Sequence, residues 1–319
     1  MVAPKRIPSR VRHVAADGPL GLRELDRFSE TSLERWNAAS QDLDELHDSL
    51  YFGLEPERRR YRPELIAALT SVEAVELRIV RWCRAVTYRY SLAPLSCAGS
   101  LQFIGGRFNA GTELDPQTLT AWPALYVAED FETAFREKFQ LPSDSLTQGL
   151  TPKDMALGEG SSLANVMVSG HLMRVFDMTH AASLNAVSSV FRRIAMPPRA
   201  AKLRKKLGIS EAGMVRTAGH AYDAVLKHNW RVFPIQFGLP SPSQILAELI
   251  RAAGFEAILY RSTKGPGRCV AVFADRLQEA SFVELADPAP PEVRHRRLDT
   301  ESAIELAGWD TVAAQFRAR

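Results

Sequence analysis

The chain has 319 residues, in which 40 lysines and arginines stand against 37 aspartates and glutamates, so the formal net charge at pH 7 is +3. This near-balance argues against a strongly basic protein that wraps nucleic acid and against an acidic chain that repels itself. The hydrophobic share of 46% and the charged share of 24% are typical of a globular protein rather than a disordered one. A chain of this length is expected to form one large domain or two.

The three cysteines and seven histidines are scattered along the chain. Neither residue type has the spacing of a zinc site, and three thiols cannot all pair with one another, so the sequence predicts a reducing cytoplasm and no metal. The basic start lacks a following apolar region, and no run approaches the ~18 apolar residues of a membrane helix. We therefore expect a cytoplasmic protein without a membrane partner, although a leaderless secreted effector has the same features.

The pattern of residues 1–80 predicts a helical extension at the start of the chain. Leucine and tryptophan recur at helical intervals between about residues 27 and 51. Pro56 is expected to break that pattern, and Pro63 fits the first turn of a second helix that runs to about residue 84. The arginine run at 58–60 is interpreted as a solvated face.

Beyond the extension the chain has short apolar runs separated by glycine and proline, which are strand signals: RAVTYRY, SLQFIG, PALYVAE, HLMRVFDM, FEAILYRS and CVAVFA. Helices are expected between them. Asp130 suits the N-cap of a helix over residues 131–140, and Ser241 with Gln244 forms a capping box for a helix that ends before Gly254. Helices and short strands therefore alternate in this part of the chain.

A dense group of polar residues follows the paired glycines Gly105 and Gly106. Glycine lets the backbone turn closely around a ligand, and Arg107 and Asn109 place a fork of donors and an amide beside that turn. Such a group suits a phosphate. From these residues alone, a hairpin turn with a surface arginine is the other interpretation.

Glu137 lies on the polar side of the helix expected over residues 131–140. On a helical wheel of about 100° per residue, Phe131, Phe135 and Phe139 form one apolar stripe, and Glu137 points well away from it. By itself this is the position of a solvated surface carboxylate. Only residues brought close by the rest of the fold would give Glu137 a function.

A set of residues in a fixed order resembles the RES domain, a family named for its Arg, Glu and Ser residues. The set begins with Arg89 and Tyr90, continues through the Gly-Gly-Arg-Phe-Asn segment at 105–109, Tyr126 and Glu137, and ends at Ser262 in LYRSTKGPGRCVAVFAD. The resemblance covers roughly residues 81–140 and 241–285, and it leaves the rest of the chain unexplained.

The resemblance implies an α+β fold with a small split β-sheet core of ADP-ribosyltransferase type around a cleft for NAD. On this basis residues 81–285 form the catalytic domain, residues 1–80 its helical N-terminal extension, and residues 286–319 a C-terminal linker and helix. The segment at about 141–240 is irregular and lies outside the resemblance, so it is interpreted as a long insertion in the catalytic domain.

Members of the RES family are toxins paired with helix-turn-helix antitoxins. They cleave the nicotinamide–ribose bond of NAD by phosphorolysis, with inorganic phosphate as co-substrate, or by hydrolysis, and some transfer ADP-ribose to a protein. The resemblance therefore implies an NAD phosphorylase or glycohydrolase with NAD as substrate and an antitoxin as partner. A mono-ADP-ribosyltransferase with a protein acceptor and an inactive RES fold with a binding or regulatory role stay open as alternatives.

Each residue of the set acquires a role from the resemblance. Glu137 is expected to face the cationic ribose left when nicotinamide departs, because a carboxylate stabilises an oxocarbenium-like transition state. Arg89 and Arg107 are expected to bind the pyrophosphate or an incoming phosphate. The remaining roles are stacking of Tyr126 and Tyr90 on the nicotinamide ring, a contribution of Asn109 to the phosphate-binding turn, and a Ser262 hydroxyl that holds the ribose or Glu137.

The chain departs from the family in its loops. Phe108 stands where the family more often has tryptophan, Ala110 stands where a proline-containing sequence is usual, and the intervals from Arg107 to Tyr126 and from Glu137 to Ser262 are long. We expect the added segments to cover the cleft, bind an antitoxin or recognise a protein acceptor.

The stretch KLRKKLGISEAGMVRTAG is loosely similar to a helix-turn-helix, with a basic helix, a glycine turn and a following helix. An amphipathic pair of helices with solvated lysines fits the modest charge of the chain better, so nucleic acid is not expected as a partner. The sequence leaves the oligomeric state undetermined, with a homo-oligomer as one alternative.

Overall fold

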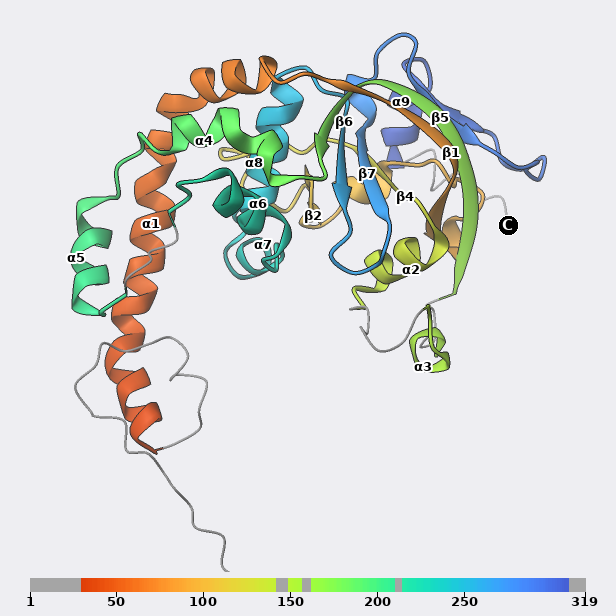
Figure 1. The fold of residues 1–319 in the computed structure, drawn as a ribbon. Coiled ribbons are helices and arrows are strands. Elements are labelled where there is room, and N and C mark those ends of the chain that lie inside the picture. The colour runs from red at the N-terminus through yellow and green to blue at the C-terminus, as the bar shows by residue number, and fades with distance from the viewer. Residues whose placement is uncertain (1–29, 142–148, 157–161, 210–213, 310–319) are drawn as a thin grey trace, which may run out of the picture. The chain divides into compact units, whose positions relative to one another are not determined.

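The computed structural model describes residues 30–141, 149–156, 162–209 and 214–309 (Figure 1). Its contacts divide the chain into two compact units, one of residues 1–60 and 194–214 and the other of residues 61–193 and 215–319. The second unit contains the β-sheet and every candidate site residue taken from the sequence, so it is described at greater length.

The described part of the chain contains both helices and strands. The described helices are α1 (Glu30–Thr70), α2 (Phe131–Phe139), α3 (Pro152–Met155), α4 (Asn185–Phe191), α5 (Pro198–Lys206), α6 (Ala218–Leu226), α7 (Val232–Phe237), α8 (Pro242–Ala252) and α9 (Ala303–Ala307). The strands are β1 (Val75–Thr87), β2 (Gly105–Gly106), β3 (Asn109–Ala110), β4 (Ala124–Ala128), β5 (Leu163–Met178), β6 (Ala257–Arg261), β7 (Arg268–Phe273), β8 (Phe282–Leu285) and β9 (Arg297–Leu298). Short 3-10 helices cover Tyr88–Tyr90, Ala98–Leu101, Ala181–Leu184 and Ala274–Arg276. The fold is thus α+β.

In the first unit, α1 packs against α5. Their shared apolar cluster consists of Ala39, Leu43, Leu46, Ala200, Leu203 and Leu207. Two ion pairs at the surface also join these helices: Arg199 pairs with Glu45, and Lys206 pairs with Asp42. The basic helix that the sequence indicated here therefore directs part of its charge toward acidic side chains of the same unit.

Helix α1 continues through Pro56 and Pro63, so the prediction of two helices separated at Pro56 is wrong. Proline removes one helical hydrogen bond, and compensating contacts lie directly beside it. Glu55 accepts hydrogen bonds from Arg58 at 2.7 Å and from Arg59 at 2.8 Å, three and four residues further along the helix. The arginine run is therefore partly engaged in holding this turn.

The predicted second helix also ends earlier than expected, because α1 stops at Thr70 and β1 begins at Val75. β1 pairs antiparallel with β5 along its length, from Val75 opposite Val175 to Thr87 opposite Leu163. The segment contains valine, isoleucine and tryptophan, which favour a strand once a partner strand is present. Pairing with a distant segment therefore decides the conformation of residues 75–87.

The main sheet has seven strands in the order β1-β4-β7-β6-β5-β8-β9, and an additional pairing joins β1 to β5. Strands β1, β4, β7, β6 and β5 thus form a closed ring of hydrogen-bonded neighbours. The β5–β6 pair is parallel and the other pairs are antiparallel. Because β5 lies inside the segment predicted as an insertion, only part of that segment is outside the sheet. The segment after residue 285 likewise adds β9 before its helix, α9.

The period of two along the strands gives the sheet two different faces. Along β4, Leu125 and Val127 belong to one apolar cluster, whereas Tyr126 packs against the other. The cluster that Tyr126 packs against also contains Cys269 from β7 and apolar residues of helices α6 and α8. The face that carries Tyr126 and Cys269 is therefore the face that carries the candidate site.

Two helix starts near the site agree with the sequence prediction. Asp130 caps α2 by accepting a hydrogen bond from the Thr133 N–H at 2.8 Å. Ser241 and Gln244 form the expected capping box of α8. Both caps are local interactions between residues three apart, which explains why the sequence alone indicates them.

Candidate functional site

A cavity of about 250 Å³ opens on this face of the sheet. Seven parts of the second unit line it: strands β1, β4, β6 and β7, the Gly105–Gly106 turn with Arg107, helix α2 with the residue that follows it, and the Trp230–Arg231 segment between α6 and α7. Of the residues predicted from the sequence, Arg107, Tyr126 and Glu137 lie in its wall.

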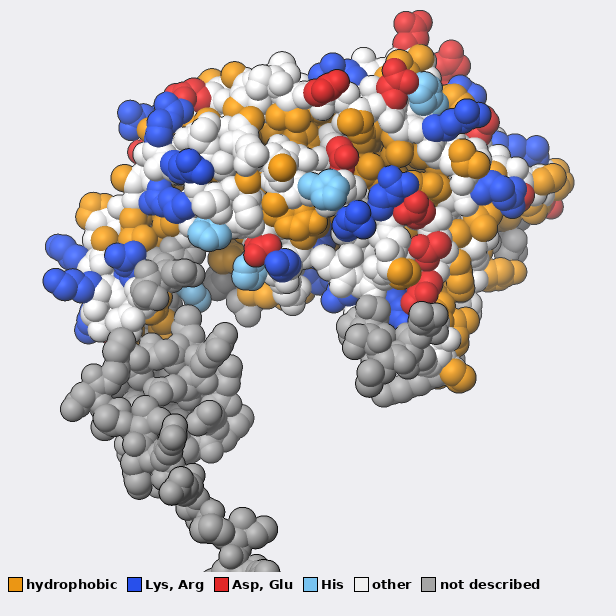
Figure 2. All heavy atoms as spheres, in the orientation of Figure 1, with side chains coloured by type: hydrophobic (Ala, Val, Ile, Leu, Met, Phe, Trp, Pro, Cys, Tyr) orange, Lys and Arg blue, Asp and Glu red, His pale blue; other side chains and the backbone are white. Residues whose placement is uncertain are grey.

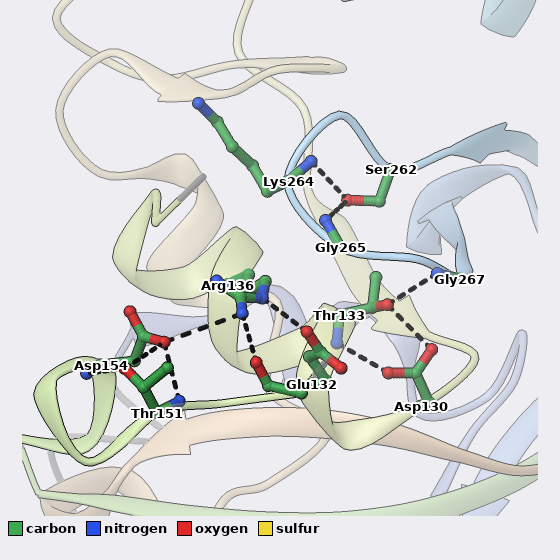
Figure 3. A network of polar contacts seen from close by, with 11 residues as sticks. Asp130, Glu132, Thr133, Arg136, Thr151, Asp154, Ser262, Lys264, Gly265 and Gly267 are labelled. Atoms are coloured by element: carbon green, nitrogen blue, oxygen red, sulfur yellow. Dashed lines mark hydrogen bonds and ion pairs between the residues drawn. The ribbon is translucent and has the colours of Figure 1, made fainter. Parts of the chain in front are cut away.

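Glu137 is half-buried in the cavity wall and is bonded to Ser262. The Ser262 hydroxyl lies 2.6 Å from Glu137 Oε1, although the two residues are 125 positions apart in the chain. Ser262 Oγ also accepts hydrogen bonds from the Lys264 N–H at 3.0 Å and the Gly265 N–H at 2.9 Å (Figure 3). Because these two donors occupy both lone pairs of the oxygen, the hydroxyl hydrogen is directed at Glu137. Ser262 is therefore a donor that positions the carboxylate.

The loop that carries Ser262 is fastened to the first turn of α2 (Figure 3). The Gly267 N–H donates to Thr133 Oγ1 at 2.9 Å, and Thr133 Oγ1 donates to Asp130 Oδ2 at 2.8 Å. A Cβ at Gly267 would lie 2.2 Å from Asp130 Oδ2, and one at Gly265 would lie 2.6 Å from Thr133 Cα. Only glycine permits this close approach, and the approach brings Ser262 within reach of α2.

The paired glycines form a tight turn held from inside by Asn109, which is fully buried. Its Oδ1 accepts from the Gly106 N–H at 2.9 Å and from the Tyr126 hydroxyl at 2.9 Å. Its Nδ2 donates to the carbonyl oxygens of Ser100 at 2.6 Å and Trp122 at 3.1 Å. Asn109 thus lies behind the cavity wall with its amide saturated, so its placement does not match the phosphate-binding role expected from the sequence. It builds the turn instead.

The Tyr126 hydroxyl also forms hydrogen bonds within the protein. Besides donating to Asn109, the hydroxyl oxygen accepts from the Phe108 N–H at 2.9 Å, and burial raises the pKa of the phenol well above its usual range. A Cβ at Gly106 would lie 2.5 Å from the Tyr126 Oη, so glycine is required where the ring passes the turn. The hydroxyl is therefore occupied by protein partners, and the ring is the part of Tyr126 that remains for the cavity.

Gln244 contributes to the same turn and was missed as a site residue by sequence reasoning. Its side-chain Nε2 lies 2.8 Å from the Ile104 carbonyl oxygen, 3.0 Å from that of Gly106 and 3.0 Å from that of Asn109. The capping box at the start of α8 was visible in the sequence. The second use of this glutamine, which ties α8 to the turn, depends on contacts 135 to 140 residues away.

Arg107 is buried in the cavity wall, where its Nη1 donates to the carbonyl oxygens of Val225 at 2.9 Å and Leu226 at 3.1 Å. These carbonyls end helix α6, and a cation at a helix C-terminus is favourable. The other nitrogen atoms of the guanidinium have no partner among the described residues. Arg107 is therefore anchored at one corner and retains donors for a ligand.

Arg89 and Tyr90 do not line the cavity, contrary to the roles expected from the sequence. Arg89 is exposed on the 3-10 helix after β1, with its guanidinium 4.6 Å from the centre of the Tyr90 ring. Tyr90 packs edge-on against Trp309 at 5.9 Å. The 3-10 helix ends the strand and carries both residues away from the lining.

The lining contains three cations that the sequence did not single out. Arg84, from β1, donates to the carbonyl oxygens of Pro94 at 2.7 Å, Ser96 at 2.8 Å and Tyr126 at 2.9 Å. Lys138, from α2, donates to Thr87 Oγ1 at 3.0 Å, and Arg231 is the third. Burial lowers the pKa of all three groups. No local signal distinguishes these side chains from surface cations, because β1, α2 and the segment before α7 meet at the cavity only in the folded chain.

Charge in the cavity is strongly unbalanced. Among the described residues of the lining, Arg84, Arg107, Lys138 and Arg231 face one carboxylate, Glu137. On the face of the sheet-bearing unit seen in Figure 2, by contrast, acidic and basic side chains are interspersed. The cavity therefore combines a positive lining suited to an anionic ligand with a single positioned carboxylate.

Within the described part of the chain, no group of three or more His, Cys, Asp or Glu residues is arranged to hold a metal ion. None of the helices in that part is both long and apolar enough to cross a membrane.

The sequence matches no family model and no curated protein. Among solved structures, the chain is similar to a chain of the M. tuberculosis MbcT–MbcA toxin–antitoxin complex. The match has a TM-score of 0.38 and 15% sequence identity, and it covers 76% of this chain and 97% of the other. A likeness at this level assigns neither a fold family nor an activity to the chain.

Proposed function

We propose that the chain is an NAD-consuming enzyme that breaks the bond between nicotinamide and ribose by phosphorolysis or hydrolysis. One observation carries the proposal: a half-buried carboxylate, Glu137, is held by a serine donor in the wall of a cavity whose other charged groups are cations. The resemblance to RES domains supports it, because Arg107, Tyr126, Glu137 and Ser262 come together although they are far apart in the chain. An ADP-ribosyltransferase-type core belongs to the same proposal.

The chemistry needs one carboxylate and one anion-binding region. When the bond between ribose C1′ and the nicotinamide nitrogen breaks, the electron pair leaves with nicotinamide, which becomes neutral, and the sugar becomes cationic. Glu137 stabilises that positive charge in a cavity partly shielded from water. Water or a phosphate oxygen then bonds to C1′. Water releases a proton to solvent and gives ADP-ribose, whereas inorganic phosphate gives the ADP-ribose phosphate ester.

The residues of the lining divide these tasks. Ser262 fixes the Glu137 carboxylate through Oε1, and Glu137 Oε2 has no hydrogen-bond partner among the described residues. The Tyr126 ring supplies an aromatic wall for the nicotinamide. Arg107 and the other cations of the lining favour the pyrophosphate of NAD.

The test measures nicotinamide release from NAD by the purified chain, with and without inorganic phosphate. Dependence on phosphate identifies a phosphorylase, and ADP-ribose formation without phosphate identifies a hydrolase. Isotope left on protein after incubation with labelled NAD identifies an ADP-ribosyltransferase instead. Absence of all three products contradicts the proposal and leaves a binding or regulatory protein.

A test in cells addresses the toxin role that the resemblance implies. Induction of the chain in bacteria is expected to lower total NAD before growth stops, and co-expression of an antitoxin partner is expected to prevent both. Growth arrest at a constant NAD level would contradict NAD consumption as the cause.

A further inference from the structure

The Trp230–Arg231 segment reaches the cavity from a part of the chain that the RES resemblance does not cover. It lies between α6 and α7, and both residues belong to the lining. Trp230 is 7% exposed, and the Arg231 guanidinium lies 4.6 Å from the centre of a Trp230 ring. A buried indole beneath a guanidinium restricts its motion and holds its flat face in place. Arg231 is therefore held at the cavity by a packed neighbour.

Arg231 differs from the other cations of the lining in its hydrogen bonding. Arg84, Arg107 and Lys138 each donate to oxygen atoms of the protein. Among the described residues, the Arg231 guanidinium has no hydrogen-bond or ion-pair partner, and only its backbone N–H donates, to Asn229 Oδ1 at 3.2 Å. A half-buried guanidinium without a protein acceptor has all of its donors available to a ligand in the cavity.

The charges that act on Arg231 come from the site itself. Burial lowers its pKa, repulsion from Arg107 lowers it further, and attraction by Glu137 opposes these effects. Arg231 and Arg107 both line the cavity. Two guanidinium groups with unused donors in one cavity wall are suited to an anion with several oxygen atoms, and phosphoryl groups are the anions that such forks bind best.

We propose that Arg231 is a substrate-binding residue that, together with Arg107, binds phosphoryl oxygens of the ligand in this cavity. The segment between α6 and α7 then contributes to substrate selection as well as to the wall. The identity of the ligand as a dinucleotide rests on the proposed function, whereas the need for a phosphoryl group follows from the two arginines alone.

The direct test is binding, because it does not require turnover. ADP-ribose and nicotinamide riboside are titrated into the chain and followed by calorimetry and by tryptophan fluorescence, since Trp230 lies against Arg231. Arg231→Gln is expected to weaken ADP-ribose binding roughly tenfold or more, the loss typical of a charged hydrogen bond. Arg231→Lys retains the charge but lacks the forked guanidinium donors, so its affinity for ADP-ribose is expected to lie between those of the wild type and Arg231→Gln. Nicotinamide riboside, which lacks phosphate, is expected to bind all variants alike.

A matched control and a kinetic readout separate binding from folding. Arg276→Gln removes an exposed arginine that does not line the cavity and is expected to leave binding unchanged. If the chain cleaves NAD, Arg231→Gln is expected to raise KM by the same factor and to leave kcat within about twofold. Thermal unfolding of each variant shows whether the fold is retained, and Arg231→Lys serves as the test if Arg231→Gln is unfolded.

The outcomes distinguish this inference from the proposed function. If the chain releases no nicotinamide but binds ADP-ribose through Arg231, the proposed function fails and this inference stands. If the chain cleaves NAD and folded Arg231→Gln has an unchanged KM and an unchanged affinity for ADP-ribose, this inference fails and the proposed function stands. Failure of the wild-type chain to bind ADP-ribose, ADP or inorganic phosphate overturns the inference as well.

Discussion

Two inward-facing glutamates in the second unit show how differently the same side chain is used. Glu256, just before β6, is fully buried, and its carboxylate accepts hydrogen bonds from the Arg174 N–H at 2.9 Å, the Gln278 N–H at 2.8 Å and the Ser281 hydroxyl at 2.8 Å. The Met173 N–H is a further donor. Glu137 is half-buried, accepts one such bond from Ser262, and faces cations across a cavity.

The difference lies in how many donors each carboxylate has. Four donors from two segments saturate Glu256 and join β5 and the turn after residue 276 to the start of β6, so its oxygen atoms are unavailable to a ligand. Glu137 is fixed at one oxygen atom and retains the other. A saturated buried carboxylate maintains the fold, whereas a positioned and unsaturated one at a cavity is prepared for chemistry. The predictions below test this contrast.

The largest effect is expected from removing the saturated carboxylate. Glu256→Ala removes the acceptor of the Arg174 and Gln278 N–H groups and of the Ser281 hydroxyl in the interior, while the Met173 N–H keeps Ser281 Oγ as its acceptor, so the free energy of unfolding should fall by roughly 3–5 kcal/mol. Urea unfolding followed by circular dichroism measures this. Glu256→Gln keeps one acceptor oxygen and should lose less. An unfolding midpoint for Glu256→Ala equal to that of the wild type would remove the structural role.

The reverse pattern is expected at Glu137. Glu137→Gln keeps the size of the side chain and removes the charge, so nicotinamide release from NAD should fall by roughly 10²–10³-fold while the urea midpoint stays close to the wild type. Glu279→Gln, at an exposed carboxylate outside the lining, is the matched control and should change neither quantity. Equal turnover by Glu137→Gln and the wild type would exclude Glu137 from the mechanism.

A smaller effect is expected at Ser262, because it acts through Glu137. Ser262→Ala removes the donor to Glu137 and the acceptor of two loop N–H groups, so kcat should fall roughly tenfold and the free energy of unfolding by about 1 kcal/mol. Steady-state kinetics with NAD should show KM nearly unchanged. Ser262→Thr restores the hydroxyl and should recover kcat. A Ser262→Ala variant that loses stability and keeps the wild-type kcat would make Ser262 a purely structural residue.

The smallest effect concerns a buried thiol, Cys97, that does not line the cavity. Burial raises the pKa of the Cys97 thiol to about 12, and repulsion by Asp275 adds to this, while Arg84 opposes it. A thiol in the unfolded chain titrates near pH 8.5, so the contribution of neutral Cys97 to stability is complete below that pH and is lost as pH rises toward 12.

Between pH 7.5 and 9.5 this loss amounts to about 1 kcal/mol. Urea unfolding at both pH values, compared with Cys97→Ala, isolates the contribution because the variant lacks only this titration. The stability difference between wild type and variant should shrink at the higher pH. A difference that is constant across this range would contradict the buried neutral thiol.

Local interactions were predicted well from the sequence. Helices α2 and α8 begin at Asp130 and Ser241 as expected, because each cap joins residues three apart. The position of Glu137 away from the phenylalanine stripe of α2 is likewise a property of one helix. The prediction failed where distant pairing competes with local preference, as in β1, and where side-chain contacts compensate for proline, as after Pro56.

By itself the sequence determined that Asp130 and Ser241 cap α2 and α8, which side of α2 carries Glu137, and, through the resemblance to RES domains, a set of candidates that includes Ser262. Only the tertiary structure decided that Asn109 is saturated behind the turn, that Arg89 and Tyr90 lie outside the lining, and that Arg84 and Arg231 point into it. The reason is that caps and helix faces depend on neighbours a few residues away. The cavity depends on a closed ring of strands and on loops more than a hundred residues apart.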